Sequence, residues 1–200
     1  SVSYEFDRIN YNNKIEYKDI TYALIKIDKK NLEYFRFITD DGFVDYFNRD
    51  GKNVKKSILK TPLDGARLSS SFGMRKHPIS GYNKMHKGVD FAAPKGTPIY
   101  AGGNGVIEYV GINGGYGKYI RIRHNNDYKT AYAHLSGFKK GISKGIRVKQ
   151  GDIIGFVGST GNSTGPHLHY EIIFRGKQIN PMKLKLPSGK VLKGDELERF

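Results

Sequence analysis

Glycine recurs between short apolar runs through residues 64–182 of this 200-residue chain, and this punctuation constrains the fold more than any other feature. The chain contains 25 Gly together with 14 Tyr and 11 Phe, so residues that suit tight turns alternate with residues that suit strands. Short strands at intervals of roughly 8–12 residues are typical of an antiparallel sheet or sandwich. We therefore predict a mainly β protein with little helix.

Within this part, apolar and alternating runs predict strands over residues 98–101, 105–111, 119–124, 129–134, 153–158 and 168–174. We expect a short helix around residues 136–140 and a helical turn near residues 194–200. No internal repeat or low-complexity tract interrupts the pattern.

Residues 1–58 are predicted to form a small β-rich accessory domain with strands over 19–28, 34–39 and 43–47. The first of these runs is apolar on both faces, which predicts burial on both sides. Residues 59–63 are interpreted as a linker, residues 64–182 as a second domain and residues 183–200 as a C-terminal extension.

The positive charge is concentrated in the second part of the chain. Residues 1–60 hold 12 Lys and Arg against 10 Asp and Glu, or +2, and residues 61–200 hold 22 against 9, or +13. Such an excess suits a polyanionic partner, whether a nucleic acid, an anionic membrane surface or an anionic cell-wall polymer, and it also suits plain solubility. The absence of Cys excludes disulfides and thiolate metal sites.

No apolar run approaches the roughly 18–20 residues of a membrane span. The sequence opens at Ser1 without an initiator Met or a signal peptide, so we interpret the chain as a processed or trimmed piece of an exported protein.

Two short motifs carry metal-competent side chains. In an extended segment the side chains of His86 and Asp90 would lie on one side, and those of His167 and His169 would share a strand face. His-x-x-x-Asp alone arises often by chance, but a second motif with two imidazoles on one face strengthens it. Zn²⁺ held by three such ligands keeps an open position at which water is activated, so the pattern indicates a metal-dependent hydrolase.

A further histidine, His134, lies in the run Tyr132-Ala133-His134-Leu135. Strand alternation would place it on the same face as Tyr132. An imidazole beside a metal site can accept a proton from water or stabilise a developing oxyanion. His77 and His124 are interpreted as non-ligands.

The ordered motifs resemble the M23 family of zinc metallopeptidases, the lysostaphin-type or LytM-type peptidoglycan endopeptidases. The resemblance covers about residues 63–182, and it is carried by SFGMRKHP (71–78), MHKGVDFAAPKGTP (85–98), AGGNGV (101–106), YAHL (132–135), VKQGD (148–152) and GSTGNSTGPHLHYE (158–171).

This resemblance implies a LytM-like β domain that binds one Zn²⁺ per chain through His86, Asp90 and His169. His134 and His167 would be the catalytic pair. One would act as general base, and the other would stabilise the oxyanion or orient the water; His167 is the preferred base. The implied reaction is attack of zinc-bound water on a peptide carbonyl of a peptidoglycan stem.

The flanking residues 40–63 and 180–197 resemble periplasmic Gram-negative members of the family. This second resemblance implies a D,D-endopeptidase that cleaves D-Ala–meso-diaminopimelate cross-links and that in some cases is also a D,D-carboxypeptidase. It also implies a role in cell shape. The positive second part suits the free carboxylates of the stems. Arg75, Asn83 and Tyr116, each in or beside a glycine-rich loop, are candidate groove residues.

Three other functions agree with part of the sequence but not with all of it. A non-catalytic cell-wall-binding module, or an activator of another hydrolase, would retain the fold but lose ligands, and here all five positions match. A nucleic-acid-binding protein would fit the charge but leave the histidines unexplained. A biotinyl or lipoyl carrier would need a modifiable Lys at a tight hairpin tip, which this chain lacks. We therefore expect peptidoglycan stems as the partner and no nucleic acid.

Overall fold

The computed structural model describes residues 1–11, 14–28, 30–53, 58–76, 83–184 and 189–200. The chain divides into two compact units: residues 1–57 with 186–200, and residues 58–185. Each strand pairing among the described residues is antiparallel, as the glycine-punctuated pattern predicts. No described helix is long and apolar enough to cross a membrane.

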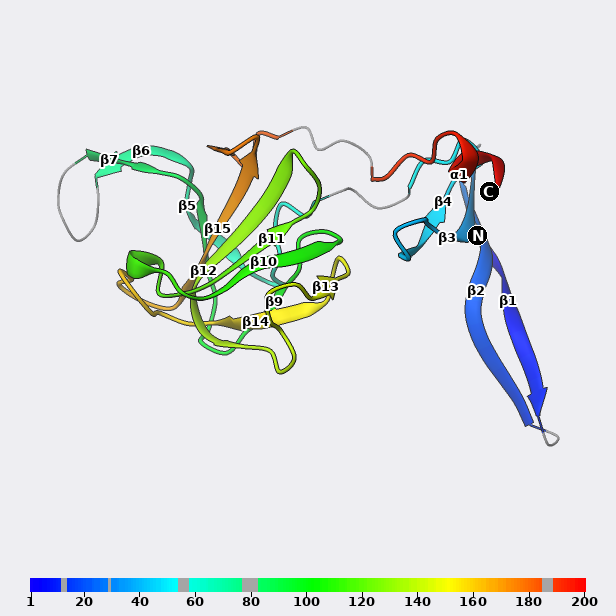
Figure 1. Cartoon of the computed structure of the whole chain (residues 1–200), viewed down its shortest axis with the longest axis horizontal. Helices are drawn as coiled ribbons and strands as arrows, with labels where there is room; N and C mark the ends of the chain where they lie inside the picture. The colour runs from blue at the N-terminus through cyan, green and yellow to red at the C-terminus, as the bar shows by residue number, and fades with distance from the viewer. Residues whose placement is uncertain (12–13, 29, 54–57, 77–82, 185–188) are drawn as a thin grey trace. The chain divides into compact units, whose positions relative to one another are not determined.

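The first unit is a four-stranded meander in which neighbours in sequence are neighbours in the sheet (Figure 1). Its elements are β1 (Val2–Tyr11), β2 (Lys14–Ile27), β3 (Lys30–Ile38), β4 (Val44–Phe47) and the short helix α1 (Asp195–Glu198). The last residue of the chain, Phe200, packs its ring against Phe35, Phe37 and Phe47.

One expectation about this unit is wrong. Strand β2 is not buried on both sides, because Ile20 and Ile27 are 39% and 55% exposed. Residues 186–200, interpreted from the sequence as part of a C-terminal extension, fold with residues 1–57: Leu192 N–H donates to Gly51 O at 2.9 Å, and Glu196 accepts the main-chain N–H of Asp40 at 2.8 Å. The helical turn predicted near the end of the chain is confirmed by α1.

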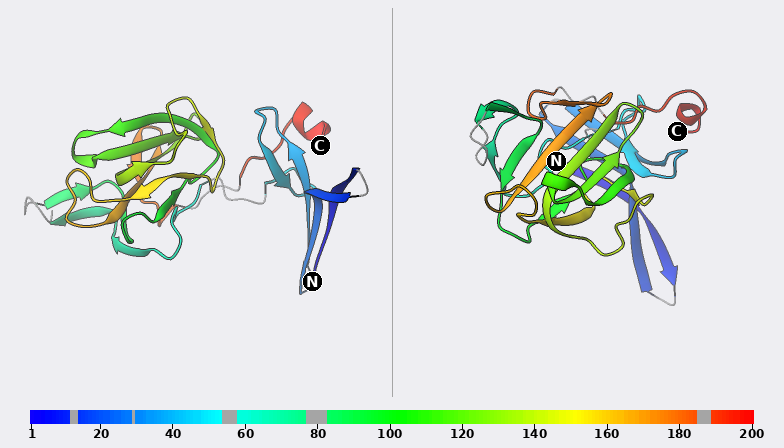
Figure 2. Two further views of the ribbon diagram at one scale, coloured as in Figure 1. Left: turned by 90° about the horizontal axis from the view of Figure 1, so that it is seen from below. Right: turned by 60° about the vertical axis from the view of Figure 1, so that its left-hand side comes forward.

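The second unit is built on a ten-stranded sheet whose main path runs β13-β10-β11-β12-β15-β8-β5. Strand β14 pairs with β12 and β9, and β16 pairs with β15. Strands β6 and β7 form a separate two-stranded sheet, teal in Figure 2. The strands are β5 (Arg67–Ser70), β6 (Gly73–Lys76), β7 (Asn83–His86), β8 (Val89–Ala92), β9 (Pro98–Tyr100), β10 (Gly105–Ile112), β11 (Lys118–Arg123), β12 (Tyr128–Phe138), β13 (Arg147–Val148), β14 (Ile153–Val157), β15 (His167–Phe174) and β16 (Lys177–Ile179), with the 3₁₀ turn η1 (Gly114–Tyr116).

All six strands predicted in this part are present, but the helix expected around residues 136–140 is wrong. Strand β12 continues to Phe138, where Gly137 pairs with Phe156 of β14. The predicted linker at residues 59–63 is also part of the packed unit: Leu63 is 5% exposed, and the Leu59 carbonyl accepts the Tyr170 hydroxyl at 2.7 Å.

Alternation along β15 separates the core from the opposite face of the sheet. Leu168, Tyr170 and Ile172 are fully buried in the core, where Tyr170 packs against Tyr132 of β12. The side chains between them, including His169, therefore point to the other face.

A partly buried chain of hydrogen bonds lies beside this core. His124 donates from Nδ1 to the Asn104 carbonyl at 2.8 Å and accepts the Thr130 hydroxyl at Nε2, also at 2.8 Å. Thr130 in turn bonds to Tyr132, which accepts the N–H of Gly102 at 2.7 Å. A second proton on His124 would turn Nε2 into a donor and leave one hydroxyl hydrogen without an acceptor, so the imidazole must stay neutral.

Burial lowers the pKa of His124 to about 4, against the opposing effect of the Asn104 carbonyl. The unfolded side chain titrates near 6.5, so the unfolded chain binds the proton at higher pH and the free energy of unfolding falls as pH drops from about 6.5 towards 4. We expect a loss on the order of 3 kcal/mol from this group. Urea unfolding followed by circular dichroism at pH 7 to 4 should show a shallower pH slope for His124→Gln; equal slopes would contradict the assignment.

Candidate active site

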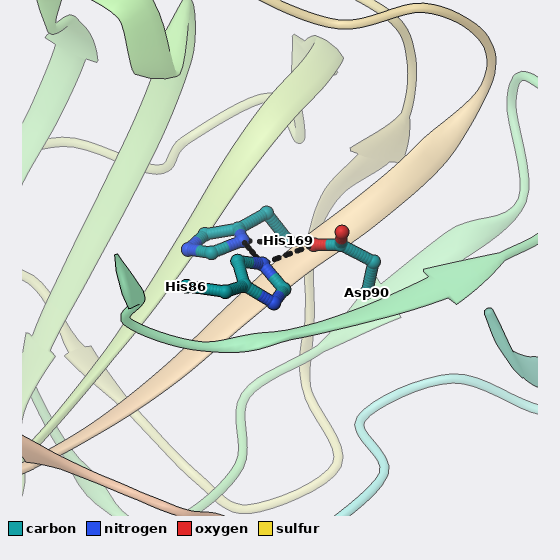
Figure 3. A group of neighbouring side chains, drawn as sticks. All are labelled: His86, Asp90 and His169. Carbon is teal, nitrogen blue, oxygen red and sulfur yellow. Dashed lines mark hydrogen bonds and ion pairs between the residues drawn. The ribbon is translucent and has the colours of Figure 1, made fainter. Parts of the chain in front are cut away.

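Three metal-competent side chains converge on the face of β15 opposite the core. One atom from each of His86, Asp90 and His169 lies within 4.8 Å of the others, and all three residues are buried (Figure 3). Asp90 Oδ1 is 3.0 Å from His86 Nε2 and 2.8 Å from His169 Nδ1, and the two imidazole nitrogens are 3.0 Å apart. Two imidazoles and one carboxylate in this arrangement could hold a metal ion.

Strand register brings Asp90 and His169 together. β8 and β15 pair with Asp90 directly opposite His169, and side chains of such a pair share one face. The neighbours Val89 and Phe91 turn into the core, where they are 0% and 2% exposed. Asp90 and its two neighbours thus follow the period of two of an extended strand.

His86 reaches the same point by a different route from the one expected. It is the last residue of β7, and Lys87 and Gly88 interrupt the extended backbone before β8 begins. A Cβ on Gly88 would lie 2.5 Å from the Tyr170 carbonyl and 2.8 Å from the His169 ring. His86 therefore approaches Asp90 across a bend that passes close to β15, and this passage requires glycine.

The ring of His134 lies beside the rings of His167 and His169, with centroid distances of 4.8 and 6.0 Å. Regular alternation along β12 predicts that His134 lies on the same face as Tyr132, and this prediction is wrong. His134 has a φ of 62°, in the left-handed region that residues other than Gly rarely adopt.

A bulge in β12 explains the difference. Tyr132 pairs with Ile120 of β11 and, three residues later, Leu135 pairs with Lys118, so two residues of β12 oppose one residue of β11. Tyr132 and Leu135 both keep the core face because their partners are two residues apart. The two side chains between them, including His134, turn to the face that carries His169.

His167 completes the group from the first position of β15. Its Nε2 is 3.9 Å from Asp90 Oδ1, and its Nδ1 is 2.8 Å from the Gly165 carbonyl. His134 has the same orientation, with Nδ1 donating to the Thr160 carbonyl at 2.8 Å. In both rings the carbonyl takes the Nδ1 hydrogen and Nε2 is left as an acceptor.

The electrostatics differ among these groups. Burial raises the pKa of Asp90, but hydrogen bonds from His169 and His86 outweigh burial and hold it well below its usual range. Burial lowers the pKa of His169, but Asp90 and Glu171 more than offset this and raise it to about 9, so this position attracts positive charge. Burial lowers the pKa of His134 to about 4, which leaves this imidazole neutral at pH 7.

Comparison with known proteins identifies the family. The model of peptidase family M23 matches residues 84–181, a span that contains all five groups. The catalytic domain of the antimicrobial peptidase lysostaphin from Staphylococcus simulans is 34% identical, with a TM-score of 0.54 over 60% of this chain and 91% of that domain. The chain belongs to peptidase family M23.

Two Vibrio cholerae proteins are similar over a longer stretch of this M23 chain. Peptidoglycan DD-endopeptidase ShyC is 45% identical over 83% of this chain and 38% of its own length. A zinc-containing peptidase of known structure is 35% identical, with a TM-score of 0.62 over 84% of this chain and 51% of that one. The chain thus spans about two fifths to one half of these relatives.

The remaining predicted site residues have different outcomes. Arg75 and Asn83 belong to the paired strands β6 and β7, but their side chains lie outside the described residues, as does all of His77. Tyr116 is partly buried, and its hydroxyl donates to Glu171 at 2.8 Å. Glu171 is not among the predicted site residues, although its position two residues after His169 places it on the same strand face.

We expect Gly88→Ala to weaken metal binding, because a methyl group there meets both the Tyr170 carbonyl and the His169 ring. The affinity for Zn²⁺, measured by chelator competition, should fall at least about tenfold, with overpacking that destabilises the fold by about 1–3 kcal/mol. Gly137→Ala is the matched control, because nothing lies within 4 Å of its added Cβ. Equal Zn²⁺ affinities of the two variants would show that the close approach is not required.

Proposed function

We propose that this chain forms the zinc-dependent catalytic part of a peptidoglycan hydrolase that cleaves peptide cross-links as a D,D-endopeptidase. The convergence of His134 and His167 on the group formed by His86, Asp90 and His169 carries this proposal. A cluster with a purely structural role would not need five titratable side chains gathered on one face of the sheet.

His86, Asp90 and His169 would hold one Zn²⁺ per chain. The donor set suits zinc, and both imidazoles have the second hydrogen bond that metal-binding histidines commonly make: His86 to the Ser71 carbonyl at 2.8 Å and His169 to Glu171 at 3.0 Å. When bound, zinc with three protein ligands supplies an electrophile and lowers the pKa of bound water.

His134 and His167 would handle protons. Each ring is anchored through Nδ1, so each has Nε2 available to accept a proton. A ring protonated at Nε2 becomes a donor and can stabilise negative charge on the carbonyl oxygen of the substrate. We assign the base to His167, whose Nε2 lies 3.9 Å from Asp90 Oδ1. We assign to His134 the orientation of the attacking water, because its neutral Nε2 can accept a hydrogen bond.

The substrate class follows from charge and relatedness. Residues 61–200 carry +13, which attracts the free carboxylates of stem peptides over about 8–10 Å. The relative ShyC bears the name of a peptidoglycan DD-endopeptidase. We propose D-Ala–meso-diaminopimelate cross-links as substrate, the periplasm of an exported protein as location, and cell-wall remodelling and cell shape as role.

The principal test combines metal content with digestion of purified meso-diaminopimelate peptidoglycan. Wild type should bind about one Zn²⁺ and convert cross-linked muropeptide dimers into monomers, resolved by chromatography and mass spectrometry. His169→Ala should lose both metal and cleavage. His134→Ala should keep the metal and lose about 10²–10⁴-fold in kcat, since it removes proton handling alone.

Two outcomes favour other functions. Stoichiometric zinc without cleavage by the wild type would favour a non-catalytic cell-wall-binding module or an activator of another hydrolase. Release of terminal D-Ala without loss of dimers would favour a D,D-carboxypeptidase. Absence of zinc from the wild type would refute the mechanism.

Arg75 and Asn83 are proposed as groove residues that bind the stem. Substitution of either by Ala should raise KM several-fold and leave the Zn²⁺ content unchanged, because neither belongs to the metal group. Steady-state kinetics on cross-linked muropeptides measures both parameters. An unchanged kcat/KM would remove that residue from the groove.

A further inference from the structure

A buried carboxylate stands directly behind the candidate metal group. Glu171 is 1% exposed and lies on the same face of β15 as His169. Beside it on this face is an apolar cluster that includes Tyr119, Ala131 and Ala133. A charged side chain is costly in such a place unless donors surround it.

Three donors surround Glu171. Its Oε1 accepts the Tyr116 hydroxyl at 2.8 Å and lies 3.0 Å from His169 Nε2, and its Oε2 accepts the Gln178 amide at 3.1 Å. These donors come from η1, β15 and β16, three separate elements. No buried side-chain nitrogen or oxygen among the described residues lacks a hydrogen bond, so the arrangement is fully satisfied.

The contact with His169 decides which nitrogen of that ring faces the metal group. A neutral imidazole carries one N–H and one lone pair. The carboxylate accepts the hydrogen on Nε2, which leaves the lone pair on Nδ1, the atom 2.8 Å from Asp90 and 3.0 Å from His86. In His86 the roles are reversed, because Nδ1 faces the Ser71 carbonyl and Nε2 faces the group.

We propose that Glu171 is a positioning residue that fixes His169 as an Nδ1 ligand and raises its affinity for the metal, with Tyr116 and Gln178 holding the carboxylate in place. The inference rests on the metal role proposed above for His169. It also changes the role of Tyr116 from groove wall to support of the metal group.

The position of Tyr116 agrees with this role. Its ring lies 5.7 Å from that of His169, so it packs on the same imidazole whose partner it holds. Burial and the charge of Glu171 raise the pKa of Tyr116, which keeps its hydroxyl a donor. The 3₁₀ turn η1, which carries Tyr116, is itself held in place, because the Gly115 carbonyl accepts the N–H of Asn162 at 2.8 Å.

Charge balance supports the same conclusion. Asp90 and Glu171 together supply two negative charges within the reach of His169. A divalent cation at the group would be neutralised by these two carboxylates, whereas Asp90 alone would leave one positive charge buried. A carboxylate behind a metal-binding imidazole also raises its basicity, and loss of such a partner commonly weakens metal affinity about 10–100-fold.

The experiment compares Glu171→Gln, Tyr116→Phe and the control Glu108→Gln in the full 200-residue chain. Glu108 is a carboxylate of β10 that pairs with Arg121 and Lys129, away from the group. The Zn²⁺ dissociation constant from chelator competition should rise about 10–100-fold for Glu171→Gln. It should rise less for Tyr116→Phe, which keeps the carboxylate, and stay unchanged for Glu108→Gln.

A second readout separates positioning from a structural role. Nitrogen NMR of the zinc-loaded wild type should show His169 protonated at Nε2 and bound through Nδ1, and Glu171→Gln should lose this single tautomer. Wild-type affinity and tautomer in Glu171→Gln, whatever its melting temperature, would overturn the inference. Should that variant not fold, wild-type Zn²⁺ affinity in Tyr116→Phe would overturn it. A wild type that binds no zinc would instead refute the proposed function.

Discussion

Pairing of β15 on both edges is the constraint on which the core and the site both depend. One edge pairs with β8, setting Asp90 opposite His169, and the other pairs with β12, setting Ala133 opposite the same histidine. A slip of one residue would exchange the two faces, burying His169 and Glu171 in the core and exposing the apolar residues. The same register that buries the apolar side chains therefore assembles the metal group.

Each histidine of the site uses one ring nitrogen as an anchor and presents the other. Three of the anchors are main-chain carbonyls that accept the hydrogen on Nδ1. The Ser71 carbonyl holds His86, the Thr160 carbonyl holds His134 and the Gly165 carbonyl holds His167. The fourth, at His169, is a carboxylate. Because carbonyl positions are set by the backbone, the orientation of the first three rings follows from the fold. Only His169 depends on a side chain that a single substitution can remove.

The sequence was sufficient for whatever depends on local periodicity. The shared face of His167 and His169, the inward turn of Val89 and Phe91, and the antiparallel class all follow from period two. Places where a strand departs from this period of two could not be recognised from the sequence. The bend at Gly88 and the bulge at His134 each depend on contacts with a neighbouring strand. The bend is marked in the sequence only by a glycine, a common residue in this chain, and the bulge has no local sequence signal. The partners of Glu171 come from three elements, so they required the tertiary structure.

The bulge at His134 serves the fold and the site together. Before it β12 pairs with β15, and after it β12 pairs with β14, beginning at Leu135 opposite Val157. The left-handed conformation costs about 1–2 kcal/mol, and the fully buried Tyr132 and Leu135 on either side offset this by holding the strand in the core. Straightening β12 would relieve the strain but return His134 to the core face. The strain thus persists because it sets both the branch of the sheet and the position of the imidazole.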